Sequence, residues 1–296
     1  MGYLHIENLY KNQDILMFRE CYAMEKIHGS SAHVAWTDGV LSLFAGGVKA
    51  VSFAEIFDQP ALTAAFIALG HSKVTVYGEV YGGKCQGMKA TYGDALRFVA
   101  FDVAINTCFL SVPDAEDIAK KLGLEFVHYV KVATDLATLD AQRDAPSEQA
   151  FRNGCANRDD PATWKKREGV VLRPLAEMRR PYLDSGRVIA KHKAAEFCER
   201  ATQPAVDAEK QAALASAEAI ANEWVTDMRL AHVLDKLGNP KEMSKTGAVI
   251  AAMVEDVTRE AKGEIVDSPD ARKAIGSRTV KLYKAIVTKI EGPSGL

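Results

Sequence analysis

The chain has 296 residues, which is enough for one large domain or two of ordinary size. Apolar residues make up 48% of it and charged residues 26%, a composition that is globular and not disordered. The net charge of −2 gives no overall basic character, so a surface for nucleic acid would have to be a local patch. No apolar run is long enough to cross a membrane, and the first residues are polar and unlike a signal peptide.

The cysteines are widely spaced along the chain. There are five of them, at Cys21, Cys85, Cys108, Cys155 and Cys198. An odd number without a C-x-x-C pair argues against both a disulfide framework and a structural zinc site. We therefore expect a reducing, cytoplasmic setting.

Up to about residue 200, short runs rich in Val, Phe and Tyr alternate with short helical patterns. Strands are predicted at 21–27, 32–36, 40–44, 73–82, 96–105, 124–132, 168–174 and 187–193. Helices are predicted at 53–70 and at 112–123, the second of which lies between a Pro-Asp start and a terminal glycine. Residues 140–163 are polar and turn-rich, and we interpret them as a long excursion with one short helix.

Beyond about residue 203 the sequence becomes Ala-rich with helical spacing. Helices are predicted within 204–240, where Gly-Asn-Pro ends the run, and at 246–263 and 268–290. In the last of these, one apolar stripe at i, i+3, i+4 and i+7 consists of Tyr283, Ile286, Val287 and Ile290. The pattern predicts two domains, a mixed α/β or α+β body at 1–202 and a helical domain at 203–296.

Charged and aromatic residues stand on or beside several predicted strands. Lys191 and Lys193 would project from one face, where a triphosphate or a nucleic-acid backbone would relieve their repulsion. Alternatively, the two lysines could lie on an exposed sheet edge, where such charges discourage aggregation. Glu79 and Glu168 could hold a divalent cation or a ribose hydroxyl, or could be solvated surface carboxylates. Phe101 could stack on a nucleobase or pack in the core.

Taken in order, five segments resemble the motifs of the covalent nucleotidyltransferases, the superfamily of ATP-dependent ligases and capping enzymes. Those motifs run K-x-[DH]-G, a Gly-Glu strand, an aromatic residue followed by Asp or Glu, E-G-x-V, and K-x-K. The matching segments here are Lys26-Ile27-His28-Gly29, Gly78-Glu79, Phe101-Asp102, Glu168-Gly169-Val170-Val171 and Lys191-His192-Lys193. Five motifs in the correct order are far more specific than any one of them.

Two features favour one branch of the superfamily. His28, where most members have Asp, resembles the type 2 RNA ligases, the phage RNA-repair and kinetoplastid editing group. The helical C-terminal pattern is also similar to the phage type 2 enzyme, whereas DNA ligases and capping enzymes usually continue into an OB domain of short strands. The resemblance implies an α+β fold. In it, a nucleotidyltransferase (ATP-grasp-like ligase) domain of antiparallel sheets with helices is followed by a small all-α C-terminal domain.

The resemblance also implies an activity, namely ATP-dependent joining of 3′-hydroxyl and 5′-phosphate RNA ends through lysyl-AMP and RNA-adenylate, at nicked or bridged duplexes. A DNA ligase or an mRNA guanylyltransferase of the same superfamily is the nearest alternative. A non-catalytic RNA-binding protein that keeps the fold is another. The implied partners are RNA ends and a polynucleotide kinase or phosphatase that acts upstream, with no membrane. The implied location is the cytoplasm, that of the host if the protein is phage-encoded.

The resemblance assigns roles residue by residue. Lys26 would be the nucleophile, Glu79 would contact the ribose and Phe101 would stack on adenine. Glu168 would organise Mg²⁺ or Mn²⁺, with Glu79 as a second contact of the metal. The other implied site residues are His28 near the reacting phosphates, Lys191 and Lys193 on the α-phosphate and pyrophosphate, and Glu25 and Ile27 beside the nucleotide. Asp102 could be purely structural.

The contacts to RNA are less well defined by the sequence. The family usually has an arginine on the strand after the nucleophile motif, and residues 41–53 contain none. Lys49 is the nearest cation there, and it would replace a bidentate fork by a point charge. Residues 271–290 could contact phosphates or form a solvated helix face. Their cations include Arg272, Lys273, Arg278, Lys281 and Lys284, without any acid.

Overall fold

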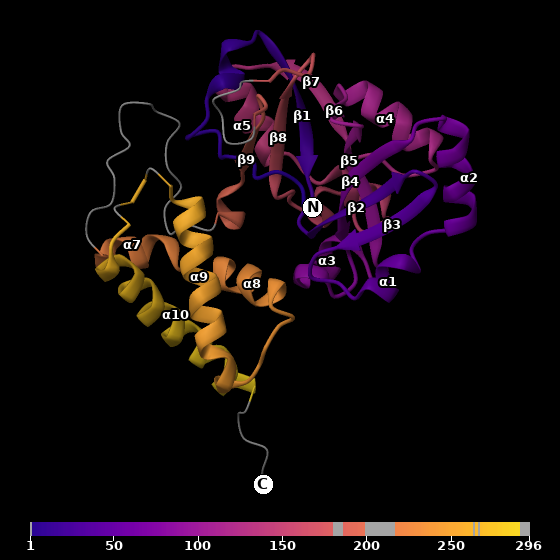
Figure 1. Ribbon diagram of the computed structural model, residues 1–296. Coiled ribbons are helices and arrows are strands. Elements are labelled where there is room, and N and C mark those ends of the chain that lie inside the picture. Colours follow the sequence, from indigo (N-terminus) through magenta and orange to yellow (C-terminus); the bar gives the residue numbers. More distant parts are fainter. Residues whose placement is uncertain (1, 180–185, 199–216, 263, 266, 291–296) are drawn as a thin grey trace. The chain divides into compact units, whose positions relative to one another are not determined.

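The computed structural model describes residues 2–179, 186–198, 217–262, 264–265 and 267–290. The chain forms two compact units, Met1–Ala194 and Ala195–Leu296 (Figure 1). The predicted boundary between residues 202 and 203, and the predicted helical residues 204–216, lie outside the described residues. None of the described helices is long and apolar enough to cross a membrane.

The first unit contains two antiparallel sheets. The four-stranded sheet has the order β7-β1-β8-β9, with the strands β7 (Tyr129–Ala133), β1 (Glu20–Lys26), β8 (Gly169–Pro174) and β9 (Ala190–Lys193). In its register Lys26 pairs with Gly169, and Gly169 pairs in turn with Lys193. Three motifs that are far apart in the sequence therefore end in one row across the sheet.

The five-stranded sheet has the order β3-β2-β4-β5-β6. Its strands are β2 (Ser30–Thr37), β3 (Val40–Ala45), β4 (Lys73–Tyr81), β5 (Arg97–Ile105) and β6 (Cys108–Phe109). The register between β4 and β5 shifts at Gly78, because Gly78 pairs with Ala100 while Tyr77 pairs with Asp102. Phe101 is thus the extra residue of a β-bulge, a feature that re-aims side chains next to sites.

The helices of the first unit connect and cover these strands. They are α1 (Ala50–Ala54), α2 (Gln59–Leu69), α3 (Lys89–Tyr92), α4 (Val112–Lys121), α5 (Leu136–Asp144) and α6 (Glu148–Arg152). Short 3₁₀ turns lie at η1 (Asp14–Met17), η2 (Cys85–Gly87) and η3 (Pro161–Thr163). The helix predicted at 112–123 is confirmed, since Ser111 caps its start by accepting a hydrogen bond from the Asp114 N–H.

Three predicted elements were wrong in extent. The helix expected at 53–70 is two helices, because Asp58 caps the start of α2. The segment at 140–163, where one short helix was expected, holds the second half of α5 and all of α6. Asp135 caps the start of α5 and Ser147 caps the start of α6. The strand expected at 124–132 begins only at Tyr129, because the segment before it bridges to β5 through Phe126.

Alternation of apolar residues explains the core of the first unit. On β2 and β4 every second side chain is buried against α2 and α4, and a Trp36–Phe66 stack with ring centroids 5.7 Å apart ties β2 to α2. The opposite faces of these strands remain partly polar. The buried side fixes the register, so the polar side is held in a defined position.

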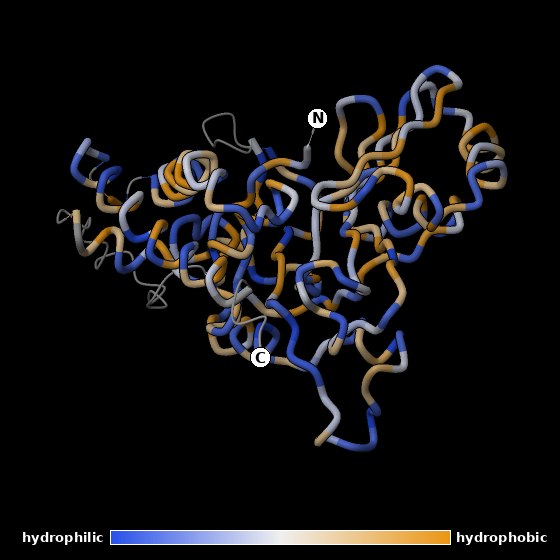
Figure 2. The backbone as a smooth tube through the Cα atoms, turned by 90° about the horizontal axis from the view of Figure 1, so that it is seen from below, coloured by the Kyte–Doolittle hydropathy of each residue, from blue (hydrophilic) through white to orange (hydrophobic). Residues whose placement is uncertain are grey.

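The second unit is helical, as predicted. Its elements are η4 (Ala195–Phe197), α7 (Ala217–Trp224), α8 (Asp227–Lys236), η5 (Met243–Lys245), α9 (Thr246–Glu260) and α10 (Pro269–Ile290). Hydrophobic and hydrophilic residues alternate around these helices (Figure 2). Tyr283 and Val287 are buried and Ile286 packs beside them, which confirms the predicted stripe of α10; the Ile290 side chain is outside the described residues.

Candidate active site

The nucleophile motif forms the turn between the two sheets. Lys26 ends β1, and Ile27, His28 and Gly29 lead directly into β2. Ile27 is buried in the core, and the backbone N–H of His28 donates to the Tyr92 hydroxyl at 3.3 Å. A Cβ at Gly29 would lie 2.3 Å from the Val80 carbonyl oxygen, so only glycine allows the turn to pack this closely against β4.

Glu168 lies at the centre of a cluster of basic side chains. Its two carboxylate oxygens lie 2.8 Å from the Lys26 Nζ and 2.9 Å from the Lys193 Nζ, and the His28 Nδ1 is 3.3 Å away. Lys26 retains 24% of its exposure, whereas Glu168 retains 2% and Lys193 7%. Lys26 is therefore the more accessible of the two amines.

The glycine between the two lysine strands makes this cluster possible. Gly169 has φ +147°, a conformation that L side chains rarely adopt. A Cβ there would lie 2.1 Å from the His192 carbonyl oxygen. The E-G pair of the motif thus has a physical basis, because the glycine lets β9 approach closely while the preceding glutamate reaches both lysines.

Burial and charge act in opposite directions on the two carboxyl groups. Burial by itself would raise the pKa of Glu168, but the ammonium groups of Lys26 and Lys193 outweigh it and hold that pKa well below its ordinary value. Burial raises the pKa of Glu79 to about 8, although Lys26 opposes the shift. At neutral pH Glu168 is therefore ionised, and Glu79 is mostly protonated.

These carboxyl groups fit a metal ion only together with a phosphorylated ligand. Within the described residues, no group of three or more His, Cys, Asp or Glu side chains could hold a metal. Glu79 and Glu168 are near enough for the charge of Glu168 to raise the pKa of Glu79. Mg²⁺ is commonly bound by one or two carboxylates and substrate phosphates, so the pair suits a cation that arrives with a nucleotide.

The two lysines of β9 do not lie on an exposed sheet edge. The Lys191 N–H donates to the Glu7 carbonyl and the Leu9 N–H donates to the Lys191 carbonyl, both at 2.8 Å, so the N-terminal segment covers that edge. Lys191 shares a face with Lys193, as predicted. His192 faces the opposite side, where its Nε2 lies 2.7 Å from the Asp140 carboxylate on α5.

Glu25 lies on the other side of β1 from Lys26. Its carboxylate accepts hydrogen bonds from the Ser147 hydroxyl at 2.6 Å and from the Gln149 N–H at 3.2 Å. The side chain therefore supports the start of α6 and points away from Glu168. Burial raises its pKa.

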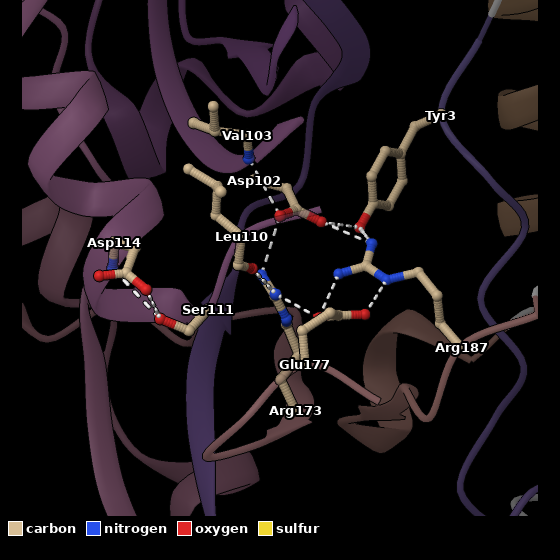
Figure 3. A network of polar contacts seen from close by, with 9 residues as sticks. All are labelled: Tyr3, Asp102, Val103, Leu110, Ser111, Asp114, Arg173, Glu177 and Arg187. Atoms are coloured by element: carbon tan, nitrogen blue, oxygen red, sulfur yellow. Dashed lines mark hydrogen bonds and ion pairs between the residues drawn. The ribbon is translucent and has the colours of Figure 1, made fainter. Parts of the chain in front are cut away.

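Asp102 belongs to a buried network (Figure 3). Its carboxylate pairs with Arg173 of β8 at 3.0 Å and with Arg187 at 2.7 Å, and it accepts the Tyr3 hydroxyl at 2.6 Å. Glu177 pairs with both arginines as well. These contacts join the two sheets and support a structural role for Asp102.

Phe101 lies beside that network, and its ring contacts Tyr3 of the N-terminal segment. The Tyr3 ring meets it edge-on at 4.9 Å between centroids. Sequence reasoning did not find Tyr3, Arg173, Glu177 or Arg187. The polar ends of the predicted strands at 168–174 and 187–193 were the available signal for the two arginines, but nothing in the sequence linked them to Asp102.

The predicted RNA contacts have varied surroundings. Lys49 is exposed and directly precedes α1. Arg272 pairs with Asp267 at 2.6 Å, and Arg278 donates to the Val225 carbonyl at 2.8 Å within the second unit. The exposed lysines on the same helix are Lys273, Lys281 and Lys284.

Comparison with known proteins agrees with this geometry. A family model described as RNA ligase matches residues 19–193, more than half of the chain. The chain belongs to the RNA ligase family. The matched range holds all five motifs, so the resemblance is confirmed at the level of the family, whereas the type 2 branch remains a prediction. A search of curated protein sequences gave no match for this RNA ligase family member.

Solved structures show the same fold. A mutant RNA ligase of Naegleria gruberi with AMP and Mn superposes with a TM-score of 0.51 at 15% identity, over 67% of this chain and 57% of that one. The Naegleria gruberi ligase with PPi gives 0.50 at 16% identity over the same shares. The match and the two antiparallel sheets confirm the predicted α+β class, and the helices α7 to α10 of the second unit confirm the predicted helical C-terminal region. This RNA ligase family member spans little more than half the length of those proteins.

Proposed function

We propose that this chain is an ATP-dependent RNA ligase that forms a covalent intermediate on Lys26. The observation that carries the proposal is the meeting of Lys26, His28 and Lys193 around the Glu168 carboxylate. All four residues lie in the range matched by the RNA ligase family. A protein that only binds RNA has no need for an accessible lysine beside a second lysine and a buried carboxylate.

The first step would be attack of the Lys26 Nζ on the α-phosphate of ATP. A P–N bond forms, the bond from the α-phosphorus to the bridging oxygen breaks, and pyrophosphate leaves with the electron pair. In the ligand-free chain the Lys26 ammonium is paired with Glu168 at 2.8 Å, so this pair has to open and the ammonium has to release a proton to solvent before its lone pair can attack. Lys191 and Lys193 would hold the α-phosphate and the departing pyrophosphate.

The later steps would return the lysine to its starting state. An oxygen of an RNA 5′-phosphate attacks the phosphorus of lysyl-AMP, the P–N bond breaks and Lys26 is released. A 3′-hydroxyl then attacks the RNA 5′-phosphorus of the RNA-adenylate, which forms the phosphodiester and expels AMP. In such phosphoryl transfers the protein mainly positions groups and neutralises charge, and the basic cluster with His28 is suited to that task.

Glu79 and Glu168 are the residues that would hold Mg²⁺ or Mn²⁺ together with ATP. A cation there would neutralise phosphate charge and compete with the lysines for Glu168. Phe101 would stack on adenine and Glu79 would also lie near the ribose. The solved Naegleria ligase that carries AMP and Mn supports this assignment by analogy of fold.

The finer features of the substrate are part of the same proposal. His28 and the helical second unit favour the type 2 branch and therefore RNA ends at nicked or bridged duplexes. Such ends need a 5′-phosphate and a 3′-hydroxyl, so a polynucleotide kinase or phosphatase would act upstream. The odd number of cysteines and the lack of a C-x-x-C pair favour a reducing cytoplasm as the setting.

Labelling with ATP tests the proposal. The purified chain is incubated with α-phosphate-labelled ATP and Mg²⁺, denatured and examined for label that stays on the protein. We expect label on the wild type and none on Lys26→Ala. Lys131→Ala is a matched control, because Lys131 lies on the adjacent strand β7 and pairs with Glu20 at 3.1 Å, outside the cluster. Sealing of a nicked RNA duplex is then measured with the same three proteins.

The outcomes separate the alternatives. Label from GTP in place of ATP would indicate a guanylyltransferase, and sealing of DNA but not RNA would indicate a DNA ligase. Absence of label from either nucleotide, with mass spectrometry showing an unmodified protein, would refute the covalent mechanism. Binding of RNA without any labelling would then favour the non-catalytic alternative.

A further inference from the structure

The face of the five-stranded sheet that carries Glu79 continues into a row of aromatic rings. Tyr77 lies two residues before Glu79 on β4, so both side chains lie on one face. His33 of β2 pairs with Tyr77, and Phe44 of β3 pairs with His33. The three rings therefore cross the sheet side by side, one from each strand.

The distances between these rings show a continuous surface. The His33 and Phe44 rings are stacked, with centroids 5.0 Å apart and planes 22° apart. The Tyr77 centroid lies 5.9 Å from that of His33. Tyr3 continues the row, 5.0 Å from Tyr77 and 4.9 Å from Phe101, the residue proposed to stack on adenine. The row thus runs from the outer strand to the proposed nucleotide site.

The outer end of the row is open to solvent. β3 is the last strand of its sheet, and Phe44 on it is 50% exposed. An aromatic cross-strand pair stabilises a sheet, but that role alone does not explain why the Phe44 ring is half exposed in a row that leads to the proposed nucleotide site.

We infer that His33, Phe44 and Tyr77 form a stacking surface for a base of the RNA strand that is being joined. The inference rests on the proposed function, because only a ligase brings an RNA end to Lys26. Tyr77 is two residues from Glu79, about 7 Å along the strand, so a base close to the reacting end reaches the row. Stacking on flat rings tolerates any base, so the surface suits an RNA end of any sequence.

The test uses RNA that contains 2-aminopurine, whose emission is quenched by stacking. The probe is placed at successive positions on either side of a nick, and binding to the full chain is followed by emission and anisotropy. Phe44→Ala is compared with Val40→Ala, which removes an exposed side chain from the same face of the same strand. We expect Phe44→Ala to raise the Kd for nicked RNA about 5-fold to 100-fold and to abolish quenching at one or two positions. Val40→Ala should behave as the wild type.

Several outcomes would overturn the inference. Equal Kd and equal quenching for wild type and Phe44→Ala would show that these rings do not form a stacking surface for RNA. A wild type that sediments as a dimer, with Phe44→Ala as a monomer that binds RNA normally, would assign the ring to a contact between two copies of the chain. Lysyl-AMP formation, which involves no RNA, reports on the proposed function separately. Its absence in the wild type refutes the ligase itself, whereas normal labelling with unaltered RNA binding refutes the stacking surface alone.

Discussion

Replacement of Asp102 by asparagine tests whether the network of Figure 3 is structural. The Asp102 carboxylate is fully buried and faces Arg173 at 3.0 Å and Arg187 at 2.7 Å. Asparagine keeps the size of the side chain and removes the charge. The two guanidinium groups, both buried, would then share the single carboxylate of Glu177.

The expected cost follows from that loss of charge. Removing one partner from a buried ion pair typically costs about 3–5 kcal/mol, because the remaining charge is left uncompensated. For a domain of this size 1 kcal/mol corresponds to about 2–4 °C in Tm. We therefore expect Asp102→Asn to lower the Tm of the first unit by roughly 6–20 °C. Tyr3→Phe removes the hydrogen bond to the same carboxylate and the one that Arg187 donates to the Tyr3 hydroxyl at 3.0 Å, and should cost about 2 kcal/mol.

Thermal unfolding and ATP labelling together make the assay. Asp114→Asn is the control, because Asp114 is an exposed acid that bonds to the helix cap Ser111 and should change stability by well under 1 kcal/mol. Below its Tm, Asp102→Asn should still form lysyl-AMP. A Tm within 2 °C of the wild type, or a folded variant that takes no label, would show that this reasoning about Asp102 is incorrect.

Three further predictions concern pH, backbone and RNA. Burial raises the pKa of Glu79 to about 8, against about 4.3 in an unfolded chain. The folded state then holds a proton that the unfolded state loses, so stability of the ligand-free chain falls as the pH rises from about 4.3 to about 8. Glu79→Gln should reduce that slope in unfolding curves recorded between pH 5 and pH 8.5, and the contribution of Glu25, whose pKa burial also raises, should remain. Gly169→Ala should strongly destabilise the fold and stop labelling, because the added Cβ would lie 2.1 Å from the His192 carbonyl oxygen. Gly87→Ala is the control in thermal unfolding. Its Cβ would meet open space, so it should cost only about 1 kcal/mol. Joint replacement of Lys281 and Lys284 by alanine tests whether these exposed side chains contact RNA phosphates. If both do, the slope of the logarithm of the RNA-binding constant against the logarithm of the salt concentration should fall in magnitude by about 2. An unchanged slope would show that neither lysine belongs to the interface.

Local patterns were sufficient to locate the motifs on strands. Lys26 at the end of β1, Glu79 on β4 and Lys193 on β9 all lie where alternating apolar residues placed them. The helical character of the second unit also followed from periodicity. The breaks between α1 and α2 and between α5 and α6 did not, because Asp58 and Ser147 begin new helices as N-caps inside segments that were interpreted as holding one helix each.

Strand pairing was beyond the reach of the sequence. That Glu168 serves both Lys26 and Lys193 depends on the row Lys26–Gly169–Lys193, which the register of three separate strands defines. The bulge at Phe101 and the arrival of Tyr3 beside it are likewise long-range features. Such contacts arise only when both sheets have formed, since no local propensity encodes them.

The two sheets meet through two charged clusters with different balances. At the Asp102 end, two carboxylates face the guanidinium groups of Arg173 and Arg187, so the charges compensate and the cluster binds the sheets together. Five residues before Arg173, about 17 Å along the extended chain, the Glu168 carboxylate faces two ammonium groups. Glu79 adds no compensating charge at neutral pH, because burial keeps it mostly protonated. The Lys26 end therefore has an excess of positive charge that an anionic phosphate can neutralise, and this difference, more than any single residue, supports the proposal that the reaction takes place there.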